Sequence, residues 1–213
     1  LESLAQARSL GARLMRRTCV VGFEREGRQI RAVRVRSMVG EEEMRIEAAQ
    51  VVNAAGAWAR EVALLAAAPI DMTYSKGTLL VTHSRLAGRV VNRLRRPGNA
   101  DIMMPGGTVS IVGTTSTRVE ALDDIHPTTA DADLIVEEAA RMLPALATMR
   151  FIRAYAGVRP LLGSSGAADS RSVSRGFALF DHEDHGLDNL ATITGGKLTT
   201  CRLMAERAAD LVC

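Results

Sequence analysis

The sequence has little of what marks disulfide-rich, membrane-spanning or nucleic-acid-binding proteins. It has three cysteines, a small and odd number that excludes a disulfide framework. No run of about 18 apolar residues occurs, so the sequence predicts no transmembrane helix. Aromatic residues make up only 3% of the 213 residues, which leaves few rings that could stack on bases. Because acidic and basic residues are mixed and the net charge is only +3, no nucleic-acid partner is predicted.

Lysine is almost absent from the sequence. Of the 27 basic residues only Lys76 and Lys197 are lysines, and the other 25 are arginines. A coding bias toward arginine accounts for the excess. Under such a bias, a lysine that remains is a candidate for a position where a flat guanidinium cannot replace a compact ammonium group.

The motifs of several large enzyme classes are missing as well. The sequence contains no CxxC, HExxH, P-loop or GxSxG pattern. His182 and His185 flank two acidic residues, but the polar surroundings indicate a solvated loop, and no metal site is predicted. The GxGxxG fingerprint, which cradles the pyrophosphate of a dinucleotide, is also absent.

What is present indicates a globular chain with both helices and strands. Hydrophobic residues make up 47% of the sequence and charged residues 24%, and the length suits one large or two small domains. Hydrophobic periodicity defines the elements of the N-terminal part. It predicts a helix over residues 1–17, strands over 19–23, 30–36 and 44–52, and a helix over 57–67.

The pattern changes at Pro69. Short strand-like runs separated by Gly and Pro predict an antiparallel meander between residues 73 and 115. Thr128, followed three positions later by Asp131, predicts the capped start of a helix over 130–143. The meander strands are predicted over 78–82, 90–94, 102–104 and 109–112, and later strands over 151–158, 177–180 and 190–194. The predicted buried stripe of the closing helix consists of Leu198, Cys201, Met204, Ala205, Ala208, Leu211 and Val212.

Two strand-to-helix turns and two arginines are the candidate site residues. In 193–200 a strand passes through Gly195 and Gly196 into a helix, whose first amides and positive dipole end favour a partner that gains negative charge. The turn after the predicted strand over 44–52 has small residues on which a planar or phosphate-bearing group could rest. Arg159, between a strand and a proline, needs an anionic or carbonyl partner, and Arg175 could contact a phosphate. For each feature taken alone, ordinary packing or an internal salt bridge is the more common explanation.

Seven segments carry a family resemblance. They are VVNAAGAW (51–58), KGTLL (76–80), PGG (105–107), VGTTS (112–116), RAYAGVRP (153–160), VSRG (173–176) and TGGKL (194–198). Together they resemble the FAD-dependent glycerol-3-phosphate dehydrogenases, most closely the large catalytic subunit of the anaerobic bacterial enzyme. The first segment is shared with many flavin amine oxidases, whereas the last three are more specific.

The resemblance implies an α+β flavoprotein fold with two domains. Residues 1–68 and 150–213 would form a partial, discontinuous FAD-binding domain that ends in the closing helix. Residues 69–149 would form the substrate-binding domain, a mixed and mostly antiparallel sheet with flanking helices. The boundary agrees with the change of pattern at Pro69.

The resemblance also implies roles for individual residues. The predicted FAD contacts are Val20 at the adenine end, Ala54, Ala55 and Gly56 near the middle of the cofactor, and Gly195, Gly196, Lys197, Leu198 and Thr199 at the isoalloxazine. Arg159 and Lys197 would be the catalytic residues. They would contact the C2 hydroxyl of glycerol 3-phosphate and help its proton leave as a hydride moves to the flavin. Arg175 would bind the phosphate.

The sequence departs from the family pattern in two places. Cys201 stands where relatives usually have tyrosine, and the N-terminal strand–GxGxxG–helix is missing. Residue 1 is Leu rather than Met, so the chain is expected to be a piece of a longer protein, inactive alone and unable to retain FAD. It would also stop short of the iron–sulfur-type C-terminal domain of the anaerobic enzyme's large subunit.

The implied function is the oxidation of glycerol 3-phosphate to dihydroxyacetone phosphate, with electrons passed to a quinone. Partner subunits would hold the protein in the cytoplasm, at the periphery of the inner membrane. Two alternatives stay open. An amine or amino-acid oxidase of the same superfamily would have a single carboxylate-binding arginine, and a non-catalytic association module would expose a large apolar patch.

Overall fold

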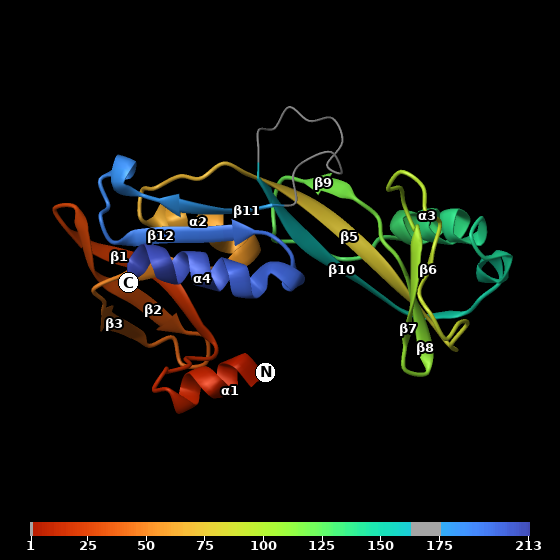
Figure 1. Cartoon of the computed structure of the whole chain (residues 1–213), viewed down its shortest axis with the longest axis horizontal. Helices are drawn as coiled ribbons and strands as arrows, with labels where there is room; N and C mark the ends of the chain where they lie inside the picture. The colour runs from red at the N-terminus through yellow and green to blue at the C-terminus, as the bar shows by residue number, and fades with distance from the viewer. Residues whose placement is uncertain (1, 163–175) are drawn as a thin grey trace.

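Two long antiparallel strands connect the two halves of the molecule (Figure 1). The structure is a computed structural model and describes residues 2–162 and 176–213. Strand β5 (Met72–Thr82) pairs with β10 (Phe151–Leu162) along the full length of both. On one side of this pair lie residues 2–65 and 177–212, and on the other side lie residues 91–113 and 129–147.

The first sheet is the predicted hairpin with a third strand added. Helix α1 (Glu2–Ser9) precedes it and is shorter than the predicted 1–17, because Gly11 has a φ of +97° and turns the chain out of the helix. The hairpin itself is confirmed. The sheet consists of β1 (Thr18–Glu26), β2 (Gln29–Ser37) and β3 (Glu43–Glu47), all antiparallel.

The predicted single strand over 44–52 is wrong, because the chain forms two strands there that belong to different sheets. β3 ends at Glu47, and β4 (Val51–Asn53) starts a new pairing. Asn189 lies beside the break between the two strands. Its side-chain amide donates to the Ala49 carbonyl at 2.9 Å, and its backbone carbonyl accepts from the Val51 amide at 2.9 Å. The helix predicted over 57–67 is confirmed as a 3-10 turn η1 (Gly56–Trp58) followed by α2 (Ala59–Leu65).

The second sheet contains the predicted meander, and its strand pairs are antiparallel as predicted. Its strand order is β10-β5-β8-β7-β6, and a short strand that the sequence did not indicate, β9, pairs with β5. With only three residues, β9 is too short to show an alternating pattern. The remaining strands are β6 (Val91–Asn92), β7 (Ile102–Gly106), β8 (Val109–Gly113) and β9 (Thr117–Val119).

Helix α3 (Thr129–Ala140) covers the second sheet as predicted. Thr128 and Asp131 form the predicted capping box at its start. A 3-10 turn η2 (Pro144–Ala147) follows α3. The buried side chains between α3, η2 and the sheet include Leu80, Met103, Val112, Ile135, Ala139 and Leu146.

The third sheet has the order β11-β12-β4, in which β12 runs antiparallel to β11 and parallel to β4. A 3-10 turn η3 (Glu183–His185) joins the first two of these strands. The chain then closes with a 3-10 turn and a helix. The elements are β11 (Phe177–Asp181), β12 (Leu190–Gly195), η4 (Leu198–Thr200) and α4 (Cys201–Val212).

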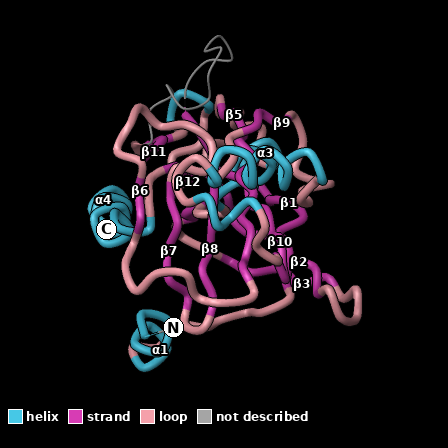
Figure 2. Tube along the Cα trace, turned by 90° about the vertical axis from the view of Figure 1, so that its right-hand side faces the viewer, coloured by secondary structure: helices cyan, strands magenta, loops and turns pink. Residues whose placement is uncertain are grey.

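The predicted buried stripe of the closing helix is wrong for most of its residues. Only Ala208 is buried, Met204 and Val212 are half-buried, and Leu198 is 89% exposed. The reason is that α4 contacts β11 and β12 with one narrow face, and it lies at the edge of the molecule in Figure 2. None of the helices in the described ranges is long and apolar enough to cross a membrane.

Candidate functional site

The two predicted turns lie next to each other. β4 and β12 are parallel, with Asn53 opposite Thr192, so both strands deliver their turns to the same edge of the third sheet. The Thr194 hydroxyl donates a 3.0 Å hydrogen bond to the Gly56 carbonyl and joins the turns. The carboxyl ends of parallel strands are the usual place for a ligand in such sheets. The structure therefore brings the predicted residues of 54–56 together with those of 195–199.

Asn53 fixes the first turn, and the sequence did not single out its side chain. It is 4% exposed, and its Nδ2 donates to the Ala59 carbonyl at 2.8 Å and to the Thr192 hydroxyl at 3.2 Å. Its Oδ1 accepts from the amide of Ala55 at 3.2 Å. A buried side-chain amide with its groups satisfied holds the backbone in one conformation. The exposed residues Ala54 and Gly56 thus stand on a rigid turn.

The second turn needs glycine at two successive positions. Gly195 and Gly196 have φ angles of +80° and +71°. A Cβ atom at residue 195 would lie 2.7 Å from the Gly176 carbonyl, and one at residue 196 would lie 2.6 Å from the sulfur of Met204. Both the backbone conformation and the packing therefore exclude a side chain here.

The start of the closing helix has two unused amides. The Lys197 amide donates to the Thr200 hydroxyl at 3.0 Å. Within the described ranges, neither the Leu198 amide nor the Thr199 amide has a hydrogen-bond partner. Both residues are exposed, as is Lys197. Unpaired amides at a helix start attract negative charge, so this point fits an anionic or electron-accepting group.

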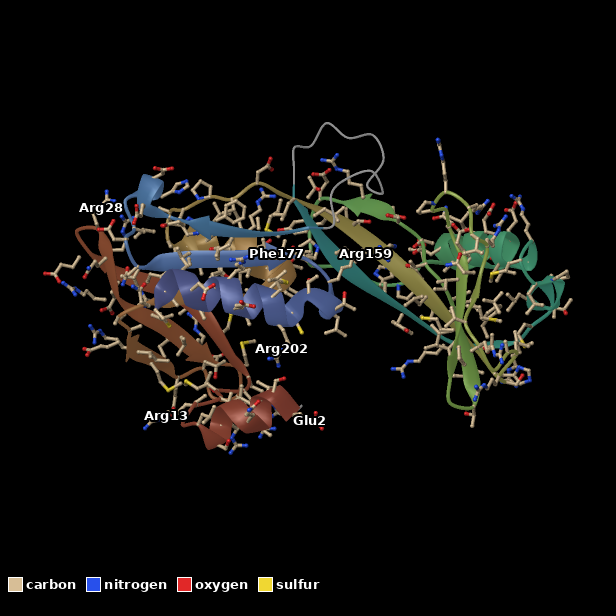
Figure 3. The ribbon with its side chains drawn as sticks, viewed as in Figure 1. Glu2, Arg13, Arg28, Arg159, Phe177 and Arg202 are labelled. Carbon is tan, nitrogen blue, oxygen red and sulfur yellow. The ribbon has the colours of Figure 1, made fainter. Side chains whose placement is uncertain are left out.

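Arg159 is held against the second sheet. It lies in β10 opposite Ser75 of β5, and Figure 3 shows it near the middle of the molecule, between the two halves. Its Nη2 donates to the Thr114 hydroxyl at 3.0 Å, and its Nη1 donates to the Thr115 carbonyl at 3.4 Å. It lines a polar cavity of about 240 Å³ together with Asn92, Arg95, Asp101, Thr114 and Ser116.

Strand β10 lies close to both turns. Ala57 and Trp58, just after the first turn, share a cavity of about 310 Å³ with Gly157 and Val158. At the second turn, a Cβ on Gly195 would lie 3.0 Å from Leu162 Cδ1. Strand β10, which contains Arg159, therefore passes beside both turns.

Two other predicted site residues lie elsewhere or outside the described ranges. Val20 lies in β1 opposite Val35, half-buried, in a sheet that shares no strand with the sheet of the two turns. Its contact with a cofactor stays a prediction. Arg175 lies outside the described residues, so its contact with a phosphate stays a prediction.

Lys76 is a packing residue in a buried ion pair. It is 8% exposed, and its Nζ lies 2.7 Å from Oδ2 of Asp131, which is 7% exposed. Burial alone would raise the pKa of Asp131, but hydrogen bonds from Lys76 and Thr128 lower it below its ordinary value. The pair ties β5 to the start of α3. A compact ammonium group suits this buried position, in line with the inference drawn from lysine scarcity.

The sequence indicated that His182 lies in a solvated loop, and for this residue the prediction is wrong. Its side chain is fully buried, and its Nε2 is hydrogen-bonded to the Thr192 hydroxyl at 2.8 Å. Burial and the neighbouring His185 lower the pKa of His182. Among the residues that the structure describes, no group of three or more His, Cys, Asp or Glu side chains could hold a metal ion.

The comparison with protein families decides the class. The family model described as "FAD dependent oxidoreductase" matches residues 2–211. The chain belongs to this family of FAD-dependent oxidoreductases. Family membership confirms the predicted α+β flavoprotein fold and the predicted cofactor class.

Relatives of this oxidoreductase include subunits of glycerol-3-phosphate dehydrogenases. It is 44% identical over 99% of its length to a subunit of the anaerobic glycerol-3-phosphate dehydrogenase of Escherichia coli (strain K12), and covers 40% of that protein. It is 42% identical to the subunit of the same name from Haemophilus influenzae, and covers 38% of it. The chain thus spans about two fifths of the length of these relatives.

Solved structures agree with the family. Glycerol-3-phosphate dehydrogenase from Bacillus halodurans, complexed with FAD, matches 99% of this chain with a TM-score of 0.77 and 25% identity. The chain covers 41% of that protein. Glycine oxidase from Bacillus cereus matches with a TM-score of 0.69 at 20% identity, which shows the shared fold alone.

The residues present fit the ring end of FAD. The unpaired amides of Leu198 and Thr199 stand at a helix start, where a flavin ring that gains negative charge on reduction would be stabilised. The rigid turn of Ala54 and Gly56 lies beside them.

The sequence analysis missed the residues that surround the guanidinium of Arg159, namely Thr114, Thr115 and Gly77, although two quoted segments contain them. Only the strand pairing places them under the guanidinium.

Proposed function

We propose that the protein is an FAD-dependent sn-glycerol-3-phosphate dehydrogenase that forms dihydroxyacetone phosphate and passes electrons to a quinone. The passage of β10 beside the turns at 54–58 and 195–199 supports the proposal, because β10 contains Arg159 and these turns fit a flavin ring. The names of the relatives from Escherichia coli and Bacillus halodurans support the choice of substrate.

The proposed division of labour follows the fold. Residues 1–68 and 150–213 form the FAD-binding part, and residues 69–149 form the substrate-binding part. β10 pairs with β5 in the second sheet and also contacts β12 of the third sheet. Arg159 therefore lies on a strand that contacts both parts. The proposed site thus lies where the two parts share a strand.

In the proposed reaction, C2 of glycerol 3-phosphate loses a hydrogen with its electron pair, the C2 hydroxyl loses a proton, and a carbonyl forms. FAD, when bound, supplies the acceptor for that hydride. Arg159 stays protonated, and its guanidinium stabilises the negative charge that grows on the C2 oxygen. Lys197 contacts the same oxygen and helps its proton leave.

The other proposed contacts hold the two molecules in place. Ala54, Ala55 and Gly56 support the cofactor near its middle, and residues 195–199 contact the ring, whose charge the amides of Leu198 and Thr199 complement. Val20 meets the adenine end. Arg175 binds the phosphate of the substrate as a two-pronged donor.

We also propose that the protein works with partner subunits. The relatives from Escherichia coli and Haemophilus influenzae are named as subunits of an anaerobic dehydrogenase, so electrons would leave through other chains. Those chains would place the protein at the cytoplasmic side of the inner membrane. A quinone would be the final acceptor.

The test is reduction of the flavin by substrate. The whole, FAD-loaded protein is mixed anaerobically with glycerol 3-phosphate, and the loss of visible flavin absorbance is followed. We expect bleaching by glycerol 3-phosphate and none by glycine or sarcosine at the same concentration. Bleaching by the amines alone would replace the proposal with the amine-oxidase alternative, and bleaching by neither would remove both.

A further inference from the structure

Gly77 leaves space that the guanidinium of Arg159 occupies. Gly77 lies in β5 opposite Gly157 of β10, two positions from the Ser75–Arg159 pair. A Cβ atom on residue 77 would lie 2.6 Å from Nη1 and 2.7 Å from Cζ of Arg159, and closer still to Nη2. Real Cβ contacts are essentially never under 3.0 Å, so the guanidinium would have to move.

Thr114 and Thr115 hold the guanidinium in this space. The Thr114 hydroxyl accepts from Nη2 at 3.0 Å, and the Thr115 carbonyl accepts from Nη1 at 3.4 Å. Two acceptors on the two terminal nitrogens fix the orientation of a flat group as well as its position.

The segment that carries these acceptors is itself attached to β5 on both sides of Gly77. The Thr78 amide donates to the Thr115 hydroxyl at 2.9 Å, and Thr115 is fully buried. The hydroxyls of Ser75 and Ser116 lie 2.9 Å apart. The acceptors therefore move with β5, and Arg159 is held relative to the sheet as a whole.

On the Arg159 face of β10, the described residues leave space over Gly157. A Cβ on Gly157 would meet no atom within 4 Å, and Tyr155, on the same face of β10, is 40% exposed. Among the described residues, the space over Gly157 lies on the same face of β10 as Arg159.

We propose that Gly77 and Thr114 are positioning residues for Arg159. They hold its guanidinium flat against β5, with its outer edge directed at the C2 oxygen of the substrate. The proposal rests on the proposed function, which makes Arg159 the group that contacts this oxygen. Each acts on the reaction through Arg159.

The test compares Gly77→Ala and Thr114→Val with three other variants in the whole, FAD-loaded protein. Arg159→Ala removes the group itself, Thr114→Ser keeps the hydroxyl, and Gly40→Ala adds a methyl group in open space at an ordinary φ. The first readout is independent of activity: the rate at which phenylglyoxal modifies Arg159, followed by peptide mass spectrometry. The exposed Arg31 is the internal reference.

We expect faster modification of Arg159 in Gly77→Ala and Thr114→Val, and the wild-type rate in Thr114→Ser and Gly40→Ala. With glycerol 3-phosphate, Gly77→Ala should lower kcat about 100-fold, because a displacement of about 1 Å has that effect. Thr114→Val should lower kcat about 10-fold, a smaller loss because the Thr115 carbonyl still holds the guanidinium, and KM should change less than kcat in both. If Gly77→Ala does not fold, the Thr114→Val and Thr114→Ser pair decides.

Unchanged modification of Arg159 in Gly77→Ala and Thr114→Val would overturn the positioning proposal. An undiminished kcat in these two variants beside a strongly reduced one in Arg159→Ala would overturn it as well. A different outcome separates the two proposals: faster modification, with full activity in Arg159→Ala, would keep the positioning of Arg159 and refute its proposed catalytic role.

Discussion

The hydroxyl of Thr194 donates a 3.0 Å hydrogen bond to the carbonyl of Gly56, across 138 positions of sequence. This bond connects the turn after β4 with the turn after β12. Both turns lie at the carboxyl ends of parallel strands, and β10 passes close to each. The proposed site depends on this connection, because it sets the spacing between the two surfaces that would enclose the cofactor.

Replacing Thr194 with valine tests the connection. Thr194 is 2% exposed, so Thr194→Val keeps the shape and leaves the Gly56 carbonyl without its donor. We expect the free energy of unfolding to fall by about 1–2 kcal/mol, and FAD to bind more weakly. Urea denaturation and FAD titration of the whole protein measure the two effects. Thr18→Val, which removes an exposed hydroxyl, is the control, and equal FAD affinity in both variants would contradict the role of the bond.

The ion pair of Lys76 and Asp131 should contribute to stability with a defined pH dependence. Asp131→Asn leaves a buried ammonium group unpaired, and we expect a loss of about 3 kcal/mol near neutral pH. The pKa of Asp131 is lower in the folded state than the ordinary value of 3.8, so its contribution is full above 3.8 and is lost as the pH falls through the folded pKa.

Denaturant unfolding at several pH values checks this sign. The difference between wild type and Asp131→Asn should shrink below pH 3.8. Asp124→Asn, at a carboxylate whose side chain is 89% exposed, is the matched control and should change stability little. A difference that grows as the pH falls would contradict the assignment.

Much of the fold could be predicted because it is encoded locally. The capping box of Thr128 and Asp131 and the glycine turn before α4 need only neighbouring residues. The strand over 44–52 was predicted wrongly because its break is made by Asn189, which is distant in sequence. The stripe on α4 was predicted wrongly because periodicity shows which residues share a face, and says nothing of whether another element covers it.

The candidate site could be predicted only in its separate parts. The turns and Arg159 each carry a local signal, but their relative placement depends on β4 pairing with β12 and on β10 lying beside both the second and the third sheet. The space over Gly77 is visible only once the register of β5 and β10 is known, because that register puts Gly77 beside Arg159.

His182 should make the protein sensitive to mild acid. Burial and His185 lower its pKa below 6.5, and its Nδ1 has no hydrogen-bond partner in the described ranges, so protonation would leave a buried N–H unpaired. Stability is therefore full above about pH 6.5 and falls as the pH decreases toward the folded pKa.

His182→Gln, which does not titrate, should show a smaller loss of stability than wild type between about pH 7 and about pH 5, measured as the shift in Tm. The exposed His83 provides the control, and His83→Gln should keep the wild-type slope. An equal slope in His182→Gln would remove His182 as the cause.

The 213-residue chain alone should retain no stoichiometric FAD. The sequence has no GxGxxG pattern to cradle the pyrophosphate, so the contacts described here reach only part of the cofactor. The visible absorbance of the purified chain measures this. A flavin band corresponding to one FAD per chain would contradict the expectation.

The central claim is that Arg159 contacts the reacting oxygen of glycerol 3-phosphate beside the flavin. The most direct measurement is the rate of anaerobic flavin bleaching by glycerol 3-phosphate in the whole, FAD-loaded protein, for wild type, Arg159→Ala and Arg31→Ala. The account predicts a rate lower by a factor of about 100 or more in Arg159→Ala, and an unchanged rate in Arg31→Ala, whose arginine forms an exposed ion pair with Glu26. A wild-type bleaching rate in Arg159→Ala would contradict it.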